Sequence, residues 1–253
     1  VMSPSTMSAI QMLKARFGGG EMPEIKPAAV VDTLAQDSAM NADTTASANV
    51  AVDVPSEAPA ADNGTVEHIM YDAVRYDGKR KANKVSFGKA GIPDYDFSKA
   101  KTIVSIGADF LNDWLLATEY SAQYGQTRKP DNDWMSQHYQ FETNMSVAGS
   151  NADVRGMIKP SQRAAVADLL LKEIKGSGAG VASELSESVV AKIKAAAADL
   201  KANKGASLVV CGSNNEGVQT IVNAINAALG NYGNTIDLDN EVNLFQGDYD
   251  KVQ

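Results

Sequence analysis

The feature that most constrains this chain is a short apolar run, Thr102–Ile106, that stops abruptly at Gly107-Ala108-Asp109. A helix-like segment follows from Asn112. This order is typical of a buried parallel strand that enters a helix through a tight turn. Glycine adopts dihedral angles that a residue with a Cβ resists, so Gly107 lets another group approach the backbone closely. We therefore predict a turn whose following amides point at whatever lies above the strand end.

A second unit of the same kind appears later, where the apolar run Leu208–Cys211 leads into Gly212-Ser213-Asn214-Asn215. Right-handed crossovers keep parallel strands pointing the same way, so both turns should emerge at one edge of a sheet. Doubly wound sheets bind their ligands at that edge. We predict that Gly107 and Gly212 lie side by side there.

The rest of the chain alternates between strand and helix patterns. Apolar periodicity and turn residues predict strands at 66–72, 138–142 and 235–239, and helices at 113–124, after Pro160, at 184–201 and after Asn215. Such alternation specifies an α/β fold with a three-layer, mainly parallel sheet.

Composition divides the chain into three parts. Residues 1–27 begin the α/β domain, 28–65 form a low-complexity insertion, and 66–253 carry the α/β domain itself. The insertion is rich in Ala, Asp, Ser, Thr, Val and Pro and has no aromatic residue, so few large side chains offset the entropy of ordering it. We expect it to be flexible, with a partner-binding role as the alternative. The sequence starts with Val1 and shows no signal peptide, so either a leader has been removed or the chain is a fragment of a longer one; we expect a fragment.

The bulk composition excludes several classes of function. A formal net charge of -8 argues against a nucleic-acid partner, which needs clustered Lys and Arg. No apolar run approaches the roughly 20 residues that span a bilayer, so membrane association would come through partner chains. The single cysteine, Cys211, excludes a self-contained iron–sulfur cluster. With only His68 and His138 besides, we expect no metal in this chain.

The two glycine turns are the candidate ligand site. Either could hold the phosphate of a nucleotide or a pterin, but neither matches G-x-G-x-x-G or a P-loop. Simple strand-to-helix turns are the competing interpretation. Asp109 would repel a phosphate unless its carboxylate binds a ribose hydroxyl or a guanine edge instead.

Other polar residues favour structural roles. His138 lacks a recognisable Ser or Cys nucleophile, so a hydrogen-bonded structural histidine is predicted. Cys211 lies in an apolar strand, where a free cysteine behaves as a small hydrophobe. Asp153 and Arg155, with Lys159, indicate a structural ion pair, and Glu142 could pair with either cation. The basic run 79–81 is interpreted as a solvated turn.

Several long strings resemble one family. They are Asp94-Tyr-Asp-Phe97, Ile103-Val-Ser-Ile-Gly-Ala-Asp-Phe-Leu111, 135–155, Ile158-Lys-Pro-Ser-Gln162 and 208–233. These segments are similar to the molybdopterin-oxidoreductase-like, iron–sulfur (B) subunit of bacterial alternative complex III. The similarity covers 3–26 and 66 to about 247, interrupted by the insertion.

The resemblance implies a non-catalytic scaffold at the periplasmic face of the bacterial inner membrane, within a complex that oxidises quinol. It implies that iron–sulfur clusters lie in the remainder of the subunit and haem c in partner subunits, beside an integral membrane quinol-binding subunit. The family's molybdopterin-like half is understood to lack the pterin. True molybdenum and tungsten relatives carry a Pro-Gly-Thr-Asp-like turn after an Ala-Asp, whereas here Ala152-Asp153 is followed by Lys159-Pro160-Ser161-Gln162.

On this interpretation, the remnant pterin site comprises Gly107, Ala108, Asp109, Gly212, Ser213, Asn214 and Asn215, with no catalytic residue. Polar side chains of these turns should then fill the space by bonding to one another or to nearby backbone. Two alternatives stay open: a fragment of an active molybdopterin-dinucleotide oxidoreductase, and a soluble nucleotide-binding module with no respiratory role.

Overall fold

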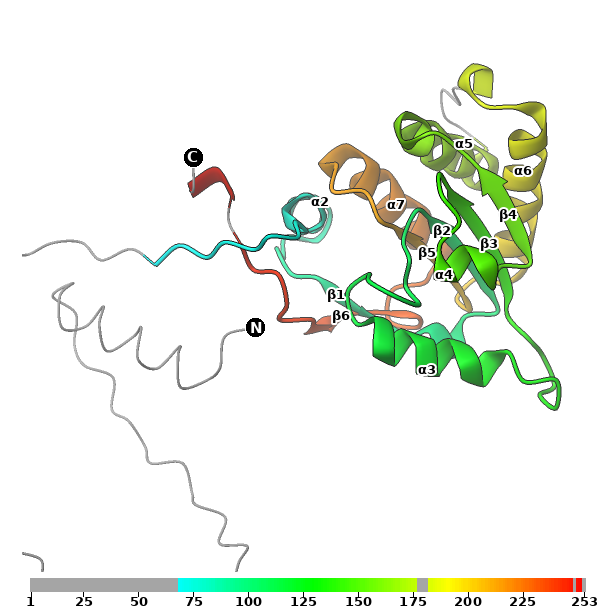
Figure 1. Cartoon of the computed structure of the whole chain (residues 1–253), viewed down its shortest axis with the longest axis horizontal. Coiled ribbons are helices and arrows are strands. Elements are labelled where there is room, and N and C mark those ends of the chain that lie inside the picture. Colours follow the sequence, from blue (N-terminus) through cyan, green and yellow to red (C-terminus); the bar gives the residue numbers. More distant parts are fainter. Residues whose placement is uncertain (1–67, 177–181, 248, 252–253) are drawn as a thin grey trace, which may run out of the picture. The chain divides into compact units, whose positions relative to one another are not determined.

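The computed structural model describes residues 68–176, 182–247 and 249–251. The start of the chain at 1–27 and the whole of the expected insertion at 28–65 lie outside this part. The elements are α2 (Asp77–Phe87), β1 (Pro93–Tyr95), β2 (Thr102–Ile106), α3 (Ala117–Thr127), β3 (Gln137–Glu142), α4 (Val147–Ser150), β4 (Val154–Met157), α5 (Arg163–Lys175), α6 (Glu187–Ala202), β5 (Ser207–Cys211), α7 (Glu216–Leu229) and β6 (Ile236–Glu241), with short 3-10 turns between some of them (Figure 1).

Four parallel strands form the central sheet, in the order β4-β3-β2-β5. Ile106, the last residue of β2, pairs with Phe141 on β3 and with Cys211 on β5. The two strands that flank the switch point, β2 and β5, are short, largely apolar runs that are buried along their whole length, because both faces of the sheet are covered. The predicted α/β fold with a mainly parallel sheet is confirmed.

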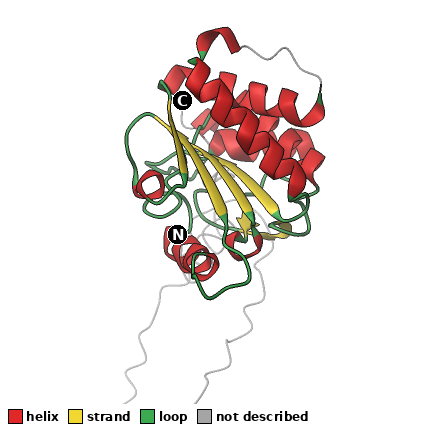
Figure 2. Cartoon of the chain, turned by 90° about the vertical axis from the view of Figure 1, so that its right-hand side faces the viewer, coloured by secondary structure: helices red, strands yellow, loops and turns green. Residues whose placement is uncertain are grey.

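Helices cover both faces of the sheet (Figure 2). Side chains alternate along a strand, so neighbouring residues such as Ile103 and Val104 enter different cores. The Val104 core is closed by the apolar stripes of α5, α6 and α7. The Ile103 core is aromatic and contains Phe97, Phe110, Trp114, Tyr120 and Tyr124.

The order in which strands are added to the sheet reverses next to β2. From β2 it proceeds to β3 and β4 on one side, and it then returns across the sheet to place β5 on the other side. The boundary between β2 and β5 is therefore a topological switch point, where open α/β sheets form a ligand-binding crevice. The two glycine turns follow these two strands.

Local side-chain and backbone signals mark several helix ends. Asn215 caps α7 by accepting a hydrogen bond from the Val218 N–H, at 3.1 Å. Gly230 ends the same helix in the left-handed conformation, with φ of 69°. In α6, Ser186 is the N-cap and accepts a hydrogen bond from the Val189 N–H.

The segment before α3 differs from the prediction. The N–H groups of Asn112, Asp113 and Trp114 all donate to the carbonyl oxygen of Asp109, which closes a compact turn in place of helix. Leu115 then adopts a positive φ of 51°. Since an α-helix cannot continue through that conformation, α3 begins at Ala117 and not at residue 113.

Three strand assignments need correction. The described part of the predicted strand at 66–72 has no strand partner and is irregular. Val154–Met157, where no strand was predicted, is the edge strand β4. The predicted strand at 235–239 exists, but as β6 it pairs antiparallel with β1 in a separate two-stranded sheet.

Candidate functional site

The two glycine turns lie in contact at the carboxyl ends of β2 and β5. The Gly212 N–H donates a 3.1 Å hydrogen bond to the Ile106 carbonyl oxygen. A Cβ on Gly212 would lie 2.1 Å from the carbonyl oxygen of Gly107, so only glycine permits this approach. Gly107 itself has a φ of 66°, in the region that favours glycine. The predicted juxtaposition of the turns is confirmed.

Asp109 uses its carboxylate to hold α4. Its Oδ1 accepts a 2.8 Å hydrogen bond from the Ala148 N–H, and its Oδ2 accepts a longer one from the Val147 N–H. Beside it, the Ala108 carbonyl oxygen accepts from the Ser105 hydroxyl at 2.8 Å. The polar groups of this turn are therefore bonded to the chain itself.

The polar groups of the second turn are likewise hydrogen-bonded within the chain. The Asn214 Oδ1 accepts from the Gly78 N–H at 2.9 Å, and its Nδ2 donates to Asp77 at 2.7 Å. Ser213 accepts from the Asn215 N–H, while Asn215 caps α7. Asp109, Asn214 and Asn215 thus bond to α4, α2 and α7, and the structure places no hydrogen bond among the three.

Two basic side chains near these turns, Arg163 and Lys79, were not predicted to be there from the sequence. Arg163, at the start of α5, lies with its Nε about 3.0 Å from where a Gly107 Cβ would be. That Nε is buried and has no hydrogen-bond partner in the described part of the chain. The local sequence does not show that Arg163 lies beside Gly107. An arginine after Pro160-Ser161-Gln162 indicates only the start of a helix.

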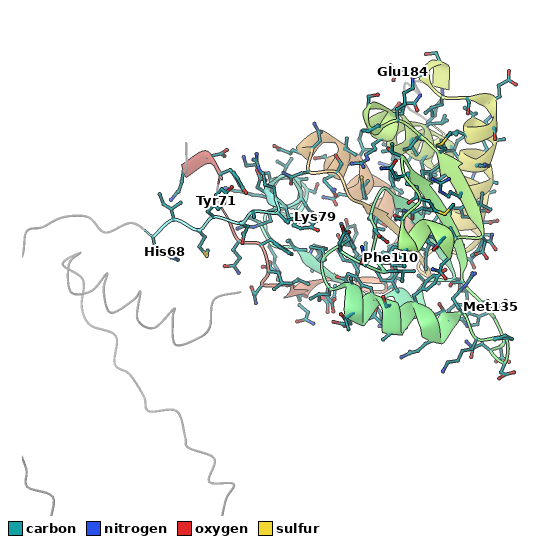
Figure 3. The ribbon with its side chains drawn as sticks, in the orientation of Figure 1. His68, Tyr71, Lys79, Phe110, Met135 and Glu184 are labelled. Carbon is teal, nitrogen blue, oxygen red and sulfur yellow. The ribbon has the colours of Figure 1, made fainter. Side chains whose placement is uncertain are left out.

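The interpretation of 79–81 as a solvated turn is wrong, because these residues lie on a helix and Lys79 is buried. Lys79 lies on α2 (Figure 3) and is only 3% exposed. Its Nζ donates to the Tyr95 hydroxyl at 3.1 Å and to Gln219 Oε1 at 2.9 Å, and it lies 5.3 Å from the centroid of the Trp114 ring. Burial lowers the pKa of Lys79 to about 8.

Cys211 behaves as predicted, as a buried apolar residue at the end of β5. Burial raises the pKa of its thiol, and the positive charges of Lys79 and Arg163 oppose that effect only partly. A protonated, buried thiol is a poor nucleophile.

His138 is a structural histidine, as predicted. It is fully buried on β3, with Nε2 3.2 Å from Gln140 Oε1 and Nδ1 3.3 Å from the Tyr124 hydroxyl. Because Gln140 presents its carbonyl oxygen to Nε2, the proton belongs on Nε2. Burial lowers the pKa of His138 to about 4, so the ring is neutral.

The ion pairs are only partly as expected. Glu142 pairs with Arg155, at 2.6 Å between Oε1 and Nε. Asp153 does not pair with Arg155; it binds Arg128 at 2.7 Å and accepts a hydrogen bond from the His138 N–H. The pairing of Asp153 with Arg128 could not be predicted from the local sequence. Arg128 follows α3 and reaches Asp153 only once β3 and β4 are paired.

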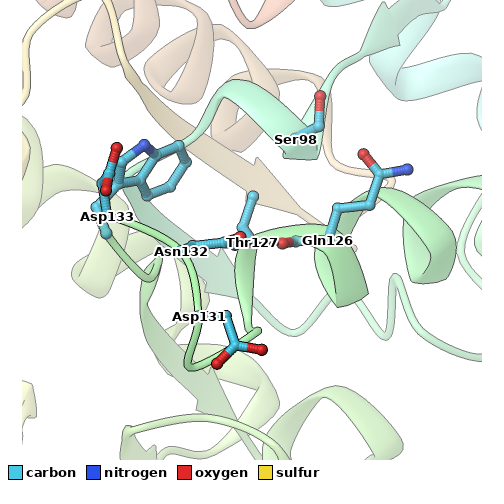
Figure 4. A pocket seen from close by; sticks show the side chains of 7 residues that line it. Ser98, Gln126, Thr127, Asp131, Asn132 and Asp133 are labelled. Atoms are coloured by element: carbon cyan, nitrogen blue, oxygen red, sulfur yellow. Dashed lines mark hydrogen bonds between the residues drawn. The ribbon is translucent and has the colours of Figure 1, made fainter.

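Three cavities in the described part of the chain are lined by residues outside the glycine turns. One of about 420 Å³ lies near the start of β2 and β3 and is lined by Ser98, Gln126, Thr127, Asp131, Asn132, Asp133 and Trp134 (Figure 4). A second, of about 610 Å³, lies along the start of α3 and is lined by Asn112, Asp113, Leu115, Leu116, Ala117, Thr118, Glu119 and Ala122. A third opens on α6 near Leu185 and Val190.

The fold and this edge define an α/β protein with a mainly parallel sheet and two touching polar turns at its switch point. No known family model matches the chain, and no curated protein is similar to it. Within the described residues, no group of three or more His, Cys, Asp or Glu side chains could hold a metal. No helix among those residues is long and apolar enough to cross a bilayer.

Proposed function

We propose that this chain is a cofactor-free scaffold within a quinol-oxidising respiratory complex of the alternative complex III type. It has the role of the molybdopterin-oxidoreductase-like part of the iron–sulfur subunit. The sheet carries no electrons itself; it supports the iron–sulfur half of the subunit and the neighbouring haem c and integral membrane subunits at the periplasmic face of the inner membrane.

The observation that carries the proposal is the contact between the two glycine turns and the internal hydrogen bonding of their polar side chains. Gly212 touches Gly107, while Asp109, Asn214 and Asn215 bond to α4, α2 and α7. A pterin dinucleotide lying between the turns would need that space and those polar groups. The residues present do not fit such a ligand between the turns, and this supports a scaffold in which the site has been lost.

The resemblance supports the respiratory assignment. The strings around β2, β3 and β5 resemble those of the alternative complex III subunit, and they include both strands that frame the edge. The charge of -8 and the absence of a cysteine set fit a part of the subunit that binds neither nucleic acid nor clusters.

Purification of the tagged protein from detergent-solubilised membranes of its source tests the proposal. We expect haem c, iron and an integral membrane subunit to co-purify, with no molybdenum, tungsten or oxidised-pterin fluorescence. Recovery from the soluble fraction without haem would instead support a free nucleotide-binding module. Stoichiometric pterin with molybdenum or tungsten would support an active enzyme.

One observation favours the active-enzyme alternative. The buried Nε of Arg163 beside Gly107 has no partner among the described residues, and an anionic group would satisfy it. Thermal unfolding with guanosine diphosphate tests this alternative. A rise in melting temperature that Arg163→Met abolishes would favour a dinucleotide site, and no rise would favour the scaffold.

A further inference from the structure

The groove at the start of α3 combines an apolar wall with an acidic rim. Leu115, Leu116 and Ala122 supply the wall, and Asp113 and Glu119 are exposed on its rim. No lysine or arginine lines this cavity of about 610 Å³. A groove of this kind is complementary to a side chain with an aliphatic stem and a positive end.

The acidic rim continues onto the β1–β6 ribbon. Asp94 on β1 is directly opposite Asp237 on β6, and like charges in such a pair destabilise a sheet. The carboxylate of Asp94 accepts a hydrogen bond from the Tyr95 N–H, and Glu119 accepts one from Gln123. Within the described residues, none of Asp94, Glu119 and Asp237 forms an ion pair.

The mutual repulsion of these carboxylates acts on the pKa of Asp94. Burial raises the pKa of Asp94, and the neighbouring charges of Glu119, Asp96 and Asp237 raise it further. Lys99 is close to this group, but its ammonium pairs with Asp96 at 2.8 Å. The cluster therefore keeps an uncompensated negative charge beside an apolar groove.

Leu115 is held in place at the groove by the rest of the fold. Its positive φ of 51° is unusual for a branched side chain. The side chain packs against the aromatic core that contains Trp114 and Tyr120. The wall of the groove is thus formed before any partner arrives, which lowers the entropic cost of binding.

We propose that this surface, Asp94, Glu119 and Asp237 around the Leu115–Leu116 groove, docks a basic segment of a partner protein. A lysine or arginine of the partner enters the groove, its stem against the leucines and its charge among the carboxylates. The carboxylates steer the approach and select the partner, and the groove supplies the contact. This inference does not depend on the respiratory assignment.

Tryptophan fluorescence of the full chain provides the assay. The chain has two tryptophans, and Trp134→Phe leaves Trp114, which adjoins Leu115, as the single reporter. The probe is a blocked peptide of alternating Leu and Arg, compared with the same peptide in which Glu replaces Arg. We expect saturable binding of the Arg peptide that weakens with added salt, and no binding of the Glu peptide.

Matched variants locate the site. Glu119→Gln and Asp237→Asn should each weaken binding threefold or more, and Ala122→Phe, which fills the groove, should weaken it at least tenfold. The controls are Asp131→Asn and Gln126→Phe, which change exposed positions at the other cavity and should leave binding unchanged. Equal losses in the controls, or equal binding of the two peptides, would overturn the proposal.

Stability provides a second, independent readout. Because Asp94 and Asp237 repel each other, Asp94→Asn with Asp237→Asn should raise the melting temperature while it weakens peptide binding. A loss of binding in these variants would then not result from unfolding. If the double variant binds the Arg peptide as tightly as the parent protein, the acidic surface is not the docking site.

Discussion

The ammonium group of Lys79 donates a 2.9 Å hydrogen bond to Oε1 of Gln219 and so joins α2 to α7. The amide nitrogen of the same Gln219 donates to the carbonyl oxygens of Cys211 and Ser213. The buried lysine is therefore tied to the turn that follows β5. It reaches this position without a carboxylate partner among the described residues, and this has consequences for stability.

The charge of Lys79 should make stability depend on pH. Its pKa is about 8 in the folded protein against 10.5 for an ordinary lysine, so the unfolded chain binds more protons between these values. Stability therefore rises with pH across that window. We expect the free energy of unfolding of the wild type, relative to Lys79→Met, to increase by about 2 kcal/mol from pH 7 to pH 9.5.

Urea unfolding at several pH values measures this difference. Lys84→Met, on an exposed position of the same helix, is the control and should run parallel to the wild type. Parallel curves for Lys79→Met as well would show that the ammonium group is solvated in solution.

The Glu142–Arg155 pair should be worth more than a surface pair. Burial alone would raise the pKa of Glu142, but hydrogen bonds from Arg155, Ser146 and Gln140 outweigh it and hold the pKa below the usual range. Arg155→Met leaves the carboxylate without its cation and should cost about 2 kcal/mol, below the fully buried case because Arg155 is partly exposed. This stability is lost as the pH falls through the lowered pKa of Glu142.

A double-mutant cycle separates the pair from the single changes. Glu142→Gln with Arg155→Met should cost less than the sum of the two single variants. The same cycle on the exposed pair Lys89 and Asp239 should show no measurable coupling. Additive effects at Glu142 and Arg155 would contradict the role assigned to the pair.

Gly212→Ala should disrupt the contact between the two turns. The new methyl group would lie 2.1 Å from the Gly107 carbonyl oxygen, so β2 and β5 must separate at their carboxyl ends. We expect a loss of about 3 kcal/mol or more in the free energy of unfolding. Gly125→Ala is the matched control, because that glycine is exposed in α3 with open space around it, and it should stabilise the protein by about 0.5–1 kcal/mol.

His138 should make the protein sensitive to acid. Its pKa of about 4 in the folded state lies below the 6.5 of an ordinary histidine, so the unfolded chain binds the extra proton first as the pH falls. Between pH 7 and pH 4.5 the wild type should lose about 2 kcal/mol relative to His138→Gln. Nuclear magnetic resonance of the imidazole checks the cause, and titration of His138 near pH 6.5 would contradict it.

Much of the fold could be predicted because its signals are local. The strands β2 and β5 are continuous apolar runs that end at glycine, and a residue's neighbours in sequence are enough to reveal that pattern. The N-cap Asn215 and the C-cap Gly230 act within one helical turn. Even the contact of Gly107 with Gly212 followed from the rule that parallel strands end at one edge.

The burial of Lys79 and the pairing of charges depend on residues far apart in the sequence. Nothing near Lys79 in sequence shows that it is buried, since its acceptor Gln219 is 140 residues away. Asp153 pairs with Arg128, and Asp94 comes to lie opposite Asp237, only when separate elements are brought together. Sequence patterns therefore determine where strands, helices and their turns form, whereas burial and charge pairing depend on distant residues that meet only in the packed structure.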